Sequence, residues 1–272
     1  MNDVYLEEYT ASENVRKYVT ETAGHGIAYV LPKVYGPIYA RLLRELAQHK
    51  SGSAGLRVLE YGCGGGMNLL WIARYLLQHH IPLEIAVGTD FSPQMTDAAA
   101  KEAALQLDPQ HRRLAAFHTV ANENLARQLP AAMGLPGNQG AGYFDFAVGV
   151  NTYRYCFRLK KELESAQGLY ALLRPGGYSV MIEMNHDFKF FRSKRRNIDK
   201  PSDQTYLPTL DQYEAVFRQA GFEIVTKKNF CWVPHSASPA LTTTLRAATP
   251  FLDLFFRRYA SRSLVVARKP LK

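Results

Sequence analysis

Short apolar segments alternate with amphipathic segments over most of this 272-residue chain, from residue 56 to residue 269. The apolar runs are typical of buried strands, and the segments between them have the periodicity of helices. In chain order, the predicted strands are LRVLEY, LEIAVGT, LAAFHTV, FDFAVGV, YSVMIEM, FEIVTKKNF and SRSLVVARK. Strands that alternate with helices predict an α/β fold with a doubly wound, mostly parallel sheet.

Two segments lie outside this alternation. Residues 1–50 read as helical, with a turn-prone aromatic piece, AGHGIAYVLPKVYGP, between two helices, and we expect them to form a cap. Residues 231–260 come between the last two strands and read as a helical lid. We therefore predict a single domain over residues 1–272, whose core comprises residues 56–230 and 261–269.

Composition limits the classes of partner. The chain has 33 basic and 24 acidic residues, a net charge of +9 and no apolar run that approaches the roughly 20 residues of a membrane span. The first residues contain no apolar signal core, so we expect a cytoplasmic protein without membrane insertion. The cysteines Cys63, Cys156 and Cys231 are far apart, so neither a disulfide framework nor a metal site is expected.

The basic residues are concentrated in two stretches. Residues 187–200 hold six basic and two acidic residues interleaved with phenylalanines, and residues 257–272 hold six basic and no acidic residues. The first stretch fits recognition of an anionic group on a substrate, a nucleic-acid groove with aromatic platforms, or a solvated flap.

A glycine cluster follows the first predicted strand, in VLEYGCGGGMN. Gly62, Gly64 and Gly66 have the spacing G-x-G-x-G, whereas the dinucleotide fingerprint is G-x-G-x-x-G and the nucleoside-triphosphate loop requires G-K-[ST]. Glu60 stands two positions before the first glycine. A carboxylate there disfavours a pyrophosphate and favours a cationic ammonium group, so the ligand we expect is a nucleoside that carries an amino acid.

Asp90 ends the second predicted strand, in AVGTDFS. A carboxylate at this strand end is placed to accept hydrogen bonds from two ribose hydroxyls. The alternative is that Asp90 caps the following helix, although Ser92 is available for that role.

These motifs, in this order, resemble those of the class I S-adenosylmethionine-dependent methyltransferases. The resemblance rests on VLEYGCGGGMN, VGTDFS, FDFAVGV, LLRPGGYSVMIEM and LDQYEAVFRQAGFEIV, and it covers residues 56–230 and the last strand. It implies a seven-stranded sheet with an antiparallel last strand, S-adenosyl-L-methionine as cofactor and S-adenosyl-L-homocysteine as product.

The resemblance also implies roles for individual residues. Glu60 and the glycines would surround the methionine part of the cofactor, Asp90 would hold the ribose, and Phe91 would lie against the adenine. Asn122, in VANENL, would accept from the adenine amino group or, alternatively, cap a helix. The full predicted cofactor set is Glu60, Gly62, Cys63, Gly64, Asn68, Asp90, Phe91, Asn122 and Val150.

The acceptor should bind at the ends of the fourth and fifth strands. The fourth ends in NTYRY, without the Asn-Pro-Pro-Tyr of family members that methylate adenine or glutamine amines. The predicted acceptor contacts are Asn151, Tyr153, Arg154, Tyr155 and Glu183. The aromatic residues and the arginine among them fit equally well as packing and surface residues.

Candidate catalytic groups are His186, His25 and Tyr153, although methyl transfer by alignment needs no base. A lone histidine in a loop also fits a structural or solvated role. No acidic residue follows the fourth strand until Glu162, so a metal is not expected.

We predict methylation of a small molecule that resembles a secondary metabolite, a lipid or a quinone, and an anionic acceptor is one option. The alternatives are an RNA or tRNA methyltransferase and an inactive cofactor-binding scaffold or regulator. Nucleic acid is not the expected partner, and the protein is expected to be a monomer or homodimer.

Overall fold

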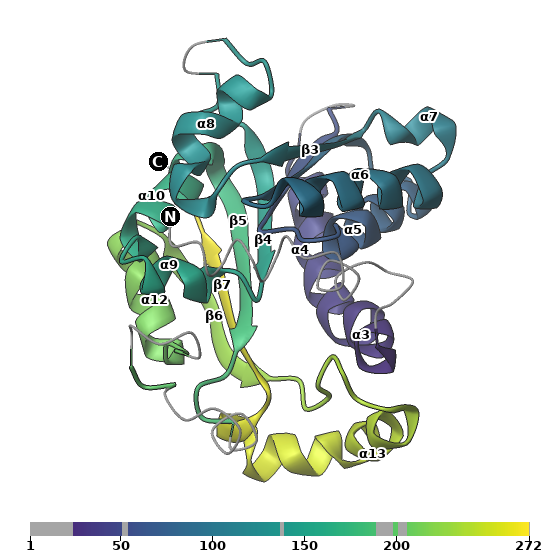
Figure 1. Ribbon diagram of the computed structural model, residues 1–272, viewed down its shortest axis with the longest axis vertical. Helices are drawn as coiled ribbons and strands as arrows, with labels where there is room; N and C mark the ends of the chain where they lie inside the picture. Colours follow the sequence, from purple (N-terminus) through teal and green to yellow (C-terminus); the bar gives the residue numbers. More distant parts are fainter. Residues whose placement is uncertain (1–23, 51–53, 137–138, 189–197, 201–205, 272) are drawn as a thin grey trace.

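A computed structural model describes residues 24–50, 54–136, 139–188, 198–200 and 206–271. Its centre is a seven-stranded sheet in the order β3-β2-β1-β4-β5-β7-β6 (Figure 1). The strands are β1 (Leu56–Tyr61), β2 (Leu83–Asp90), β3 (Ala115–Thr119), β4 (Phe144–Val150), β5 (Leu173–Met184), β6 (Glu223–Phe230) and β7 (Arg262–Arg268). β1 to β5 pair in parallel, whereas β7 runs antiparallel to β5 and β6. The prediction of a doubly wound sheet with an antiparallel last strand is confirmed.

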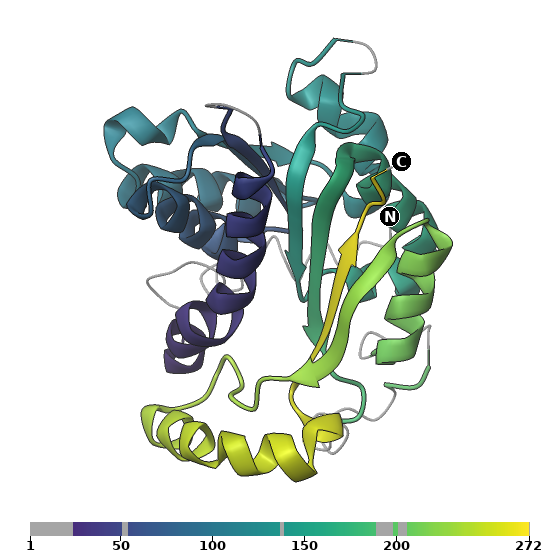
Figure 2. The same cartoon turned by 180° about the vertical axis from the view of Figure 1, so that it is seen from behind.

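Helices cover both faces of the sheet. On one face lie α3 (His25–Val30), η3 (Leu31–Tyr35), α4 (Gly36–Gln48), α5 (Met67–Gln78) and α6 (Pro93–Gln106), with α7 (Pro109–Arg112) after them. On the other lie η4 (Asn122–Asn124), α8 (Leu125–Ala132), α9 (Tyr153–Arg158), α10 (Glu162–Leu172) and α12 (Leu210–Gln219). Each set packs its apolar side chains against its own face of the sheet, which gives two hydrophobic cores. Figure 2 shows helices on both sides of the sheet from behind.

Local sequence accounts for several helix starts. α6 begins at Pro93, and the Ser92 side chain accepts from the backbone N–H of Met95, as predicted for this cap. α12 begins with a complete capping box formed by Thr209 and Gln212.

The turn predicted between the two N-terminal helices is wrong. Residues 25–35 instead form α3 and the π-helical turn η3, and α4 follows without a break. Ile27, Val30, Leu31 and Tyr35 are buried along one side of this segment. Their spacing is that of a helix face, so packing against the sheet outweighs the turn-forming tendency of glycine and proline. The first predicted helix, in residues 11–22, lies outside the described residues.

The helix α9 was not anticipated from the sequence. It is short, and its residues YRYCFR are not strong helix formers. The buried carboxylate of Glu183 accepts from the backbone N–H of Tyr153 at its first turn, while Tyr153 and Cys156 are buried in the adjacent core. Tertiary contacts thus stabilise a helix that its own sequence specifies weakly.

Asp145 stabilises the edge of the sheet at which the parallel strands begin. Its side chain is buried and accepts from Lys50 Nζ and the backbone N–H of Arg57, both at 2.7 Å, and it also pairs with Arg174. This network is structural, because it lies at the end of β4 opposite to the one where a ligand would bind in an α/β sheet.

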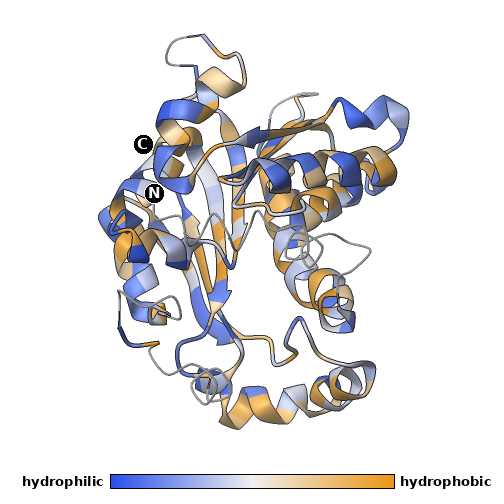
Figure 3. Cartoon of the chain, viewed as in Figure 1, coloured by the Kyte–Doolittle hydropathy of each residue, from blue (hydrophilic) through white to orange (hydrophobic). Residues whose placement is uncertain are grey.

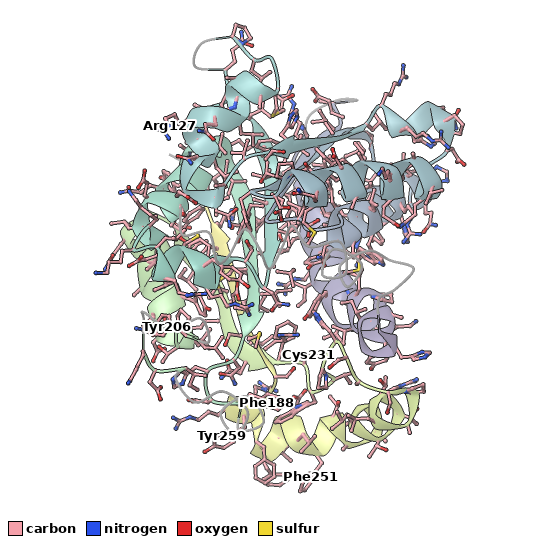
Figure 4. The ribbon with its side chains drawn as sticks, in the orientation of Figure 1. Arg127, Phe188, Tyr206, Cys231, Phe251 and Tyr259 are labelled. Carbon is pink, nitrogen blue, oxygen red and sulfur yellow. The ribbon has the colours of Figure 1, made fainter. Side chains whose placement is uncertain are left out.

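The segment between β6 and β7 contains α13 (Pro239–Phe255) and η5 (Arg257–Tyr259). α13 lies beyond the carboxyl ends of β4 and β5 and contacts α3 (Figure 1). Hydrophobic side chains are frequent along it, and several are exposed (Figure 3). Phe251 points away from the sheet, on the outer side of the helix (Figure 4).

Candidate functional site: the carboxyl ends of the strands

The glycine cluster forms a turn that side-chain-bearing residues would not readily adopt. Gly62, Gly64 and Gly66 have φ angles of +61°, +51° and +77°, so the G-x-G-x-G spacing marks three left-handed positions between β1 and α5. A Cβ atom on Gly62 would lie only 1.9 Å from Oγ1 of Thr152. Gly62 is therefore needed both for the backbone conformation and for the approach of the β4 end.

Glu60 lies directly beneath this turn. It is 1% exposed, and its two carboxylate oxygens accept from Asn68 Nδ2 at 2.9 Å and from the backbone N–H of Leu69 at 2.8 Å. The amide oxygen of Asn68 in turn accepts from the Tyr39 hydroxyl at 3.2 Å. Asn68, predicted as a cofactor contact, thus orients the carboxylate of Glu60 at the start of α5.

Asp90 connects the end of β2 to the glycine turn. Its Oδ2 accepts from the backbone N–H of Gly64 and its Oδ1 from that of Ser92, both at 3.0 Å. Ser92 itself supplies the cap of α6. Asp90 therefore does more than begin a helix, because it fixes the second glycine of the turn.

The electrostatics of this corner are unusual. Burial, together with the nearby charge of Asp90, raises the pKa of Glu60 to about 8, although the hydrogen bonds from Asn68 and Leu69 lower it. Burial also raises the pKa of Asp90, to about 6. Within the described ranges, neither carboxylate forms an ion pair with a basic side chain. Two adjacent buried acids without a basic partner fit a ligand that brings its own positive charge.

The remaining predicted cofactor residues lie around the same turn. Cys63 is buried, and its backbone N–H donates to the carbonyl of Thr89 at 2.8 Å. Phe91 and Val150 are half-buried at the ends of β2 and β4. Asn122 donates through Nδ2 to Oγ1 of Thr152 at 2.8 Å, in the 3₁₀ turn η4 rather than as the cap of that turn.

Thr152 was missed by the sequence analysis. Its hydroxyl lies next to Gly62 and accepts from Nδ2 of Asn122. Thr152, at the end of β4, therefore connects the turn after β1 to η4. A single threonine after a strand carries no recognisable sequence signal, since its importance comes from contacts with residues 30 and 90 positions earlier.

Asn151 occupies the end of β4 in a left-handed conformation, with φ at +57°. Asparagine tolerates this region better than most residues. Its backbone N–H donates to the carbonyl of Ile182, and its Oδ1 accepts from Nη1 of Arg262 at 3.1 Å. The predicted acceptor contact Asn151 thus lies where β4, β5 and β7 meet.

Two other predicted acceptor residues are inside the protein. Tyr153 is fully buried against Tyr213 and Phe217, and its hydroxyl donates to the backbone carbonyl of Glu162. Glu183 is also buried, and it supports the start of α9 as described above. Both side chains belong to the face covered by α9, α10 and α12, and their bonds give them structural roles.

Arg154 and Tyr155 contact each other on α9. Arg154 Nη2 donates to the Tyr155 hydroxyl at 2.8 Å, and Arg154 Nη1 lies against the sulfur of Met184. Their half-buried positions near the end of β5 leave both as candidates for contact with a ligand.

The two candidate histidines differ in their surroundings. His186 lies between two carboxylates, with Nδ1 at 3.0 Å from Asp187 and Nε2 at 2.6 Å from Asp199, and lines a polar hollow of about 610 Å³. Both ring nitrogens therefore lie against carboxylate oxygens and are not open to an acceptor molecule. His25 is exposed at the first turn of α3.

Three residues absent from the sequence-based predictions, Tyr35, His235 and Arg262, form a cluster that contacts Asn151 through Arg262. The Tyr35 hydroxyl is 2.8 Å from Nε2 of His235, and both side chains are close to Arg262. Their positions are fixed by α3, because the backbone N–H of Gly26 donates to the Ala237 carbonyl and that of Ile27 to the His235 carbonyl, both at 3.1 Å. These residues come from three distant parts of the chain, so no spacing could have identified them.

Most of the basic stretch, residues 189–197, lies outside the described residues. In the part of the chain that the structure describes, no group of three or more histidine, cysteine or acidic side chains is arranged to hold a metal ion. No helix within the described ranges combines the length and apolar character needed to cross a membrane.

Comparison with known proteins gives a consistent result. Residues 31–227 match the family described as "Methyltransferase domain". No curated protein sequence matches the chain significantly.

Solved structures match the fold at low sequence identity. The carbon methyltransferase CurJ superposes with a TM-score of 0.59 at 16% identity, covering 98% of this chain and 61% of that one. A putative S-adenosylmethionine-dependent methyltransferase from Listeria monocytogenes has a TM-score of 0.51 at 14% identity, covering 85% and 98%. The [4+2]-cyclase SpnF has a TM-score of 0.52 at 20% identity, covering 85% and 81%.

Proposed function

The chain belongs to the class I S-adenosylmethionine-dependent methyltransferases, and from this premise we propose that it methylates a small organic molecule. The observation that carries the proposal is the pair of buried carboxylates, Glu60 and Asp90, on either side of the left-handed glycine turn. Family membership implies use of S-adenosyl-L-methionine. The proposal concerns where that cofactor binds and what accepts the methyl group.

The residues of this corner fit the cofactor. Each Glu60 oxygen accepts one protein hydrogen bond and has a further lone pair for the ammonium group of the methionine part. The Asp90 carboxylate is equally able to accept from ribose hydroxyls in addition to its backbone donors. Phe91 would lie against the adenine, and the amide oxygen of Asn122 would accept from its amino group.

The bound cofactor would supply an electrophilic methyl group and its own leaving group. The task of the protein is then to align an acceptor with that methyl and to exclude water from the reacting atoms. Asn151, at the end of β4, is the residue we assign to the boundary between the cofactor and the acceptor. No general base is included, because His186 is held between two carboxylates.

A small organic acceptor is favoured by the elements around this edge. We propose that residues 24–50 and 231–260 act as cap and lid, since α3 and α13 contact each other beyond the strand ends (Figure 1). An enclosed site of this kind suits a molecule of limited size. The similarity in fold to CurJ, described as a carbon methyltransferase, is compatible with this class of acceptor.

One comparison favours a second candidate. SpnF, described as a [4+2]-cyclase, has a similar fold, so a chain with this architecture can carry out chemistry other than methyl transfer. In that case the cofactor corner would be retained while the acceptor edge served a different reaction or a binding role.

Transfer of labelled methyl groups separates these possibilities. The protein is incubated with methyl-labelled S-adenosylmethionine and a cell extract that has been divided into small molecules and RNA. We expect label in the small-molecule fraction, and none with the Asp90→Ala variant. Label found in RNA alone would contradict the proposed acceptor, and cofactor binding without transfer to either fraction would favour the second candidate.

A further inference from the structure

Arg262 is a buried cation at the proposed acceptor edge. It is the first residue of β7, opposite Met184 of β5 and Phe230 of β6, and it is 4% exposed. Its side chain extends across the end of β5 toward Asn151 at the end of β4. A guanidinium remains charged at any physiological pH, so this charge is enclosed in the folded protein.

The partners of this guanidinium are neutral. Nη1 donates to the amide oxygen of Asn151 at 3.1 Å, and the group also interacts with the Tyr35 hydroxyl. Nε is buried without a hydrogen-bond partner. Among the residues that the structure describes, no carboxylate lies within ion-pair distance of Arg262.

None of the described titratable groups around Arg262 forms an ion pair with it. Burial raises the pKa of Tyr35 and lowers that of His235, so the phenol and the imidazole both stay neutral beside the guanidinium. Burial also raises the pKa of Cys231, which keeps its thiol protonated. Glu183 precedes Met184 on β5 and feels the charge of Arg262, but burial raises the pKa of this carboxyl and so disfavours its charged form. Its carboxylate accepts from the backbone N–H of Tyr153 on α9 and forms no ion pair with Arg262 among the described residues.

An uncompensated buried charge is costly, by several kcal/mol for an ion taken out of water. The buried carboxylate of Asp145 is compensated by Lys50 and Arg174, whereas Arg262 has no ion-pair partner among the described residues. The absence of such compensation at Arg262 therefore points to a partner that arrives with the ligand.

We propose that Arg262 binds a carboxylate on the methyl acceptor, so that the substrate is an organic anion. Asn151 acts as a positioning residue, because its amide oxygen accepts from Nη1 of the guanidinium while Nε has no protein partner. A planar carboxylate matches the donor geometry of a guanidinium. The inference rests on the proposed function and adds the charge class of the acceptor.

Calorimetry with a simple probe tests this inference. The protein is first saturated with S-adenosylhomocysteine and then titrated with benzoate or with neutral benzamide. We expect benzoate alone to bind, and Arg262→Met to weaken it by about tenfold or more, since hydrogen bonds to charged groups contribute about 1.5–3 kcal/mol. Arg262→Lys keeps the charge but loses the paired donors, so it should give an intermediate loss and serves if the methionine variant does not fold.

Arg268→Lys is the matched control. Arg268 ends the same strand on the same face as Arg262 but at the other end of the sheet, beside Tyr178. The Arg268→Lys variant should bind benzoate with the affinity of the wild type. Failure of benzoate to bind the wild type, or equal binding by folded Arg262 variants, would overturn the inference.

The cofactor titration separates this inference from the proposed function. If S-adenosylhomocysteine does not bind the wild type, the proposed function fails. If S-adenosylhomocysteine binds the wild type, but Arg262→Met weakens its binding as much as that of benzoate, the guanidinium binds the carboxylate of the cofactor. The acceptor inference is then overturned.

Discussion

The β1–β2 corner and the edge formed by β4, β5 and β7 are built in contrasting ways. The first is made of residues close together in the sequence, in 58–69 and 88–92, and its two carboxylates have no basic partner in the described structure. The second joins Tyr35, Asn151, His235 and Arg262, and it contains a buried cation without a carboxylate partner there. The comparison shows that local sequence encodes the β1–β2 corner, the proposed cofactor site, whereas only the folded chain assembles the edge of β4, β5 and β7, the proposed acceptor site.

The largest effect is expected from removing the carboxylate on which the cofactor corner depends. Asp90→Ala should weaken S-adenosylhomocysteine binding by about a hundredfold or more, since two hydrogen bonds to a charged group would be lost at about 1.5–3 kcal/mol each. Calorimetry measures this change. Asp145→Asn, at the opposite edge, is the control and should lower the free energy of unfolding without altering affinity. Equal affinities of Asp90→Ala and wild type would contradict the role of this corner.

The next effect concerns the turn that both regions share. Gly62→Ala would place Cβ 1.9 Å from Oγ1 of Thr152, so we expect it to reduce the free energy of unfolding by about 2–4 kcal/mol and to impair cofactor binding. Gly134 also has a positive φ, +70°, but open space around it. Gly134→Ala should therefore cost only about 1 kcal/mol of backbone strain. Denaturant unfolding of both variants tests this, and similar losses would mean that the clash with Thr152 is relieved.

A third prediction concerns the protonation of Glu60 in the β1–β2 corner. The pKa of Glu60 is about 8 in the ligand-free protein against 4.5 in the unfolded chain, so the folded state binds more protons between these values. Ionisation of Glu60 therefore decreases the free energy of unfolding as the pH rises from about 4.5 to 8. A cationic ligand favours the ionised form, so cofactor binding near pH 7 should release a proton and tighten as pH rises toward 8. Calorimetry in buffers of different ionisation enthalpy measures this release, and Glu60→Gln should abolish it. An unchanged release in that variant would assign the proton to another group.

The smallest effects are expected at the candidate histidines. General base catalysis is worth about 10² to 10⁴ in rate, so loss of a true base would be obvious. We expect His186→Ala and His25→Ala to keep turnover within about tenfold of the wild type, with His25→Ala as the milder because His25 is exposed. Initial rates with labelled cofactor provide the test. A loss of more than a hundredfold in either variant would restore that histidine as a catalytic residue.

The same contrast explains how much could be predicted from the sequence. Hydrophobic periodicity located the seven strands, and glycine spacing with Glu60 and Asp90 marked a corner whose side chains the fold brings together. The segment 25–35 and α9 were missed because burial, rather than propensity, makes them helical. Tyr153 and Glu183 follow the right strands, but a strand end does not reveal on which face of the sheet a side chain will lie. Arg262 could not be found, because its importance depends on the lack of an ion-pair partner among the described residues of the folded chain.

An electron-density map of the protein bound to S-adenosylhomocysteine tests the central claim most directly. The account predicts the amino group of the ligand at Glu60, its ribose at Asp90 and its sulfur facing Asn151. A ligand bound elsewhere, for example in the polar hollow beside His186, would contradict it.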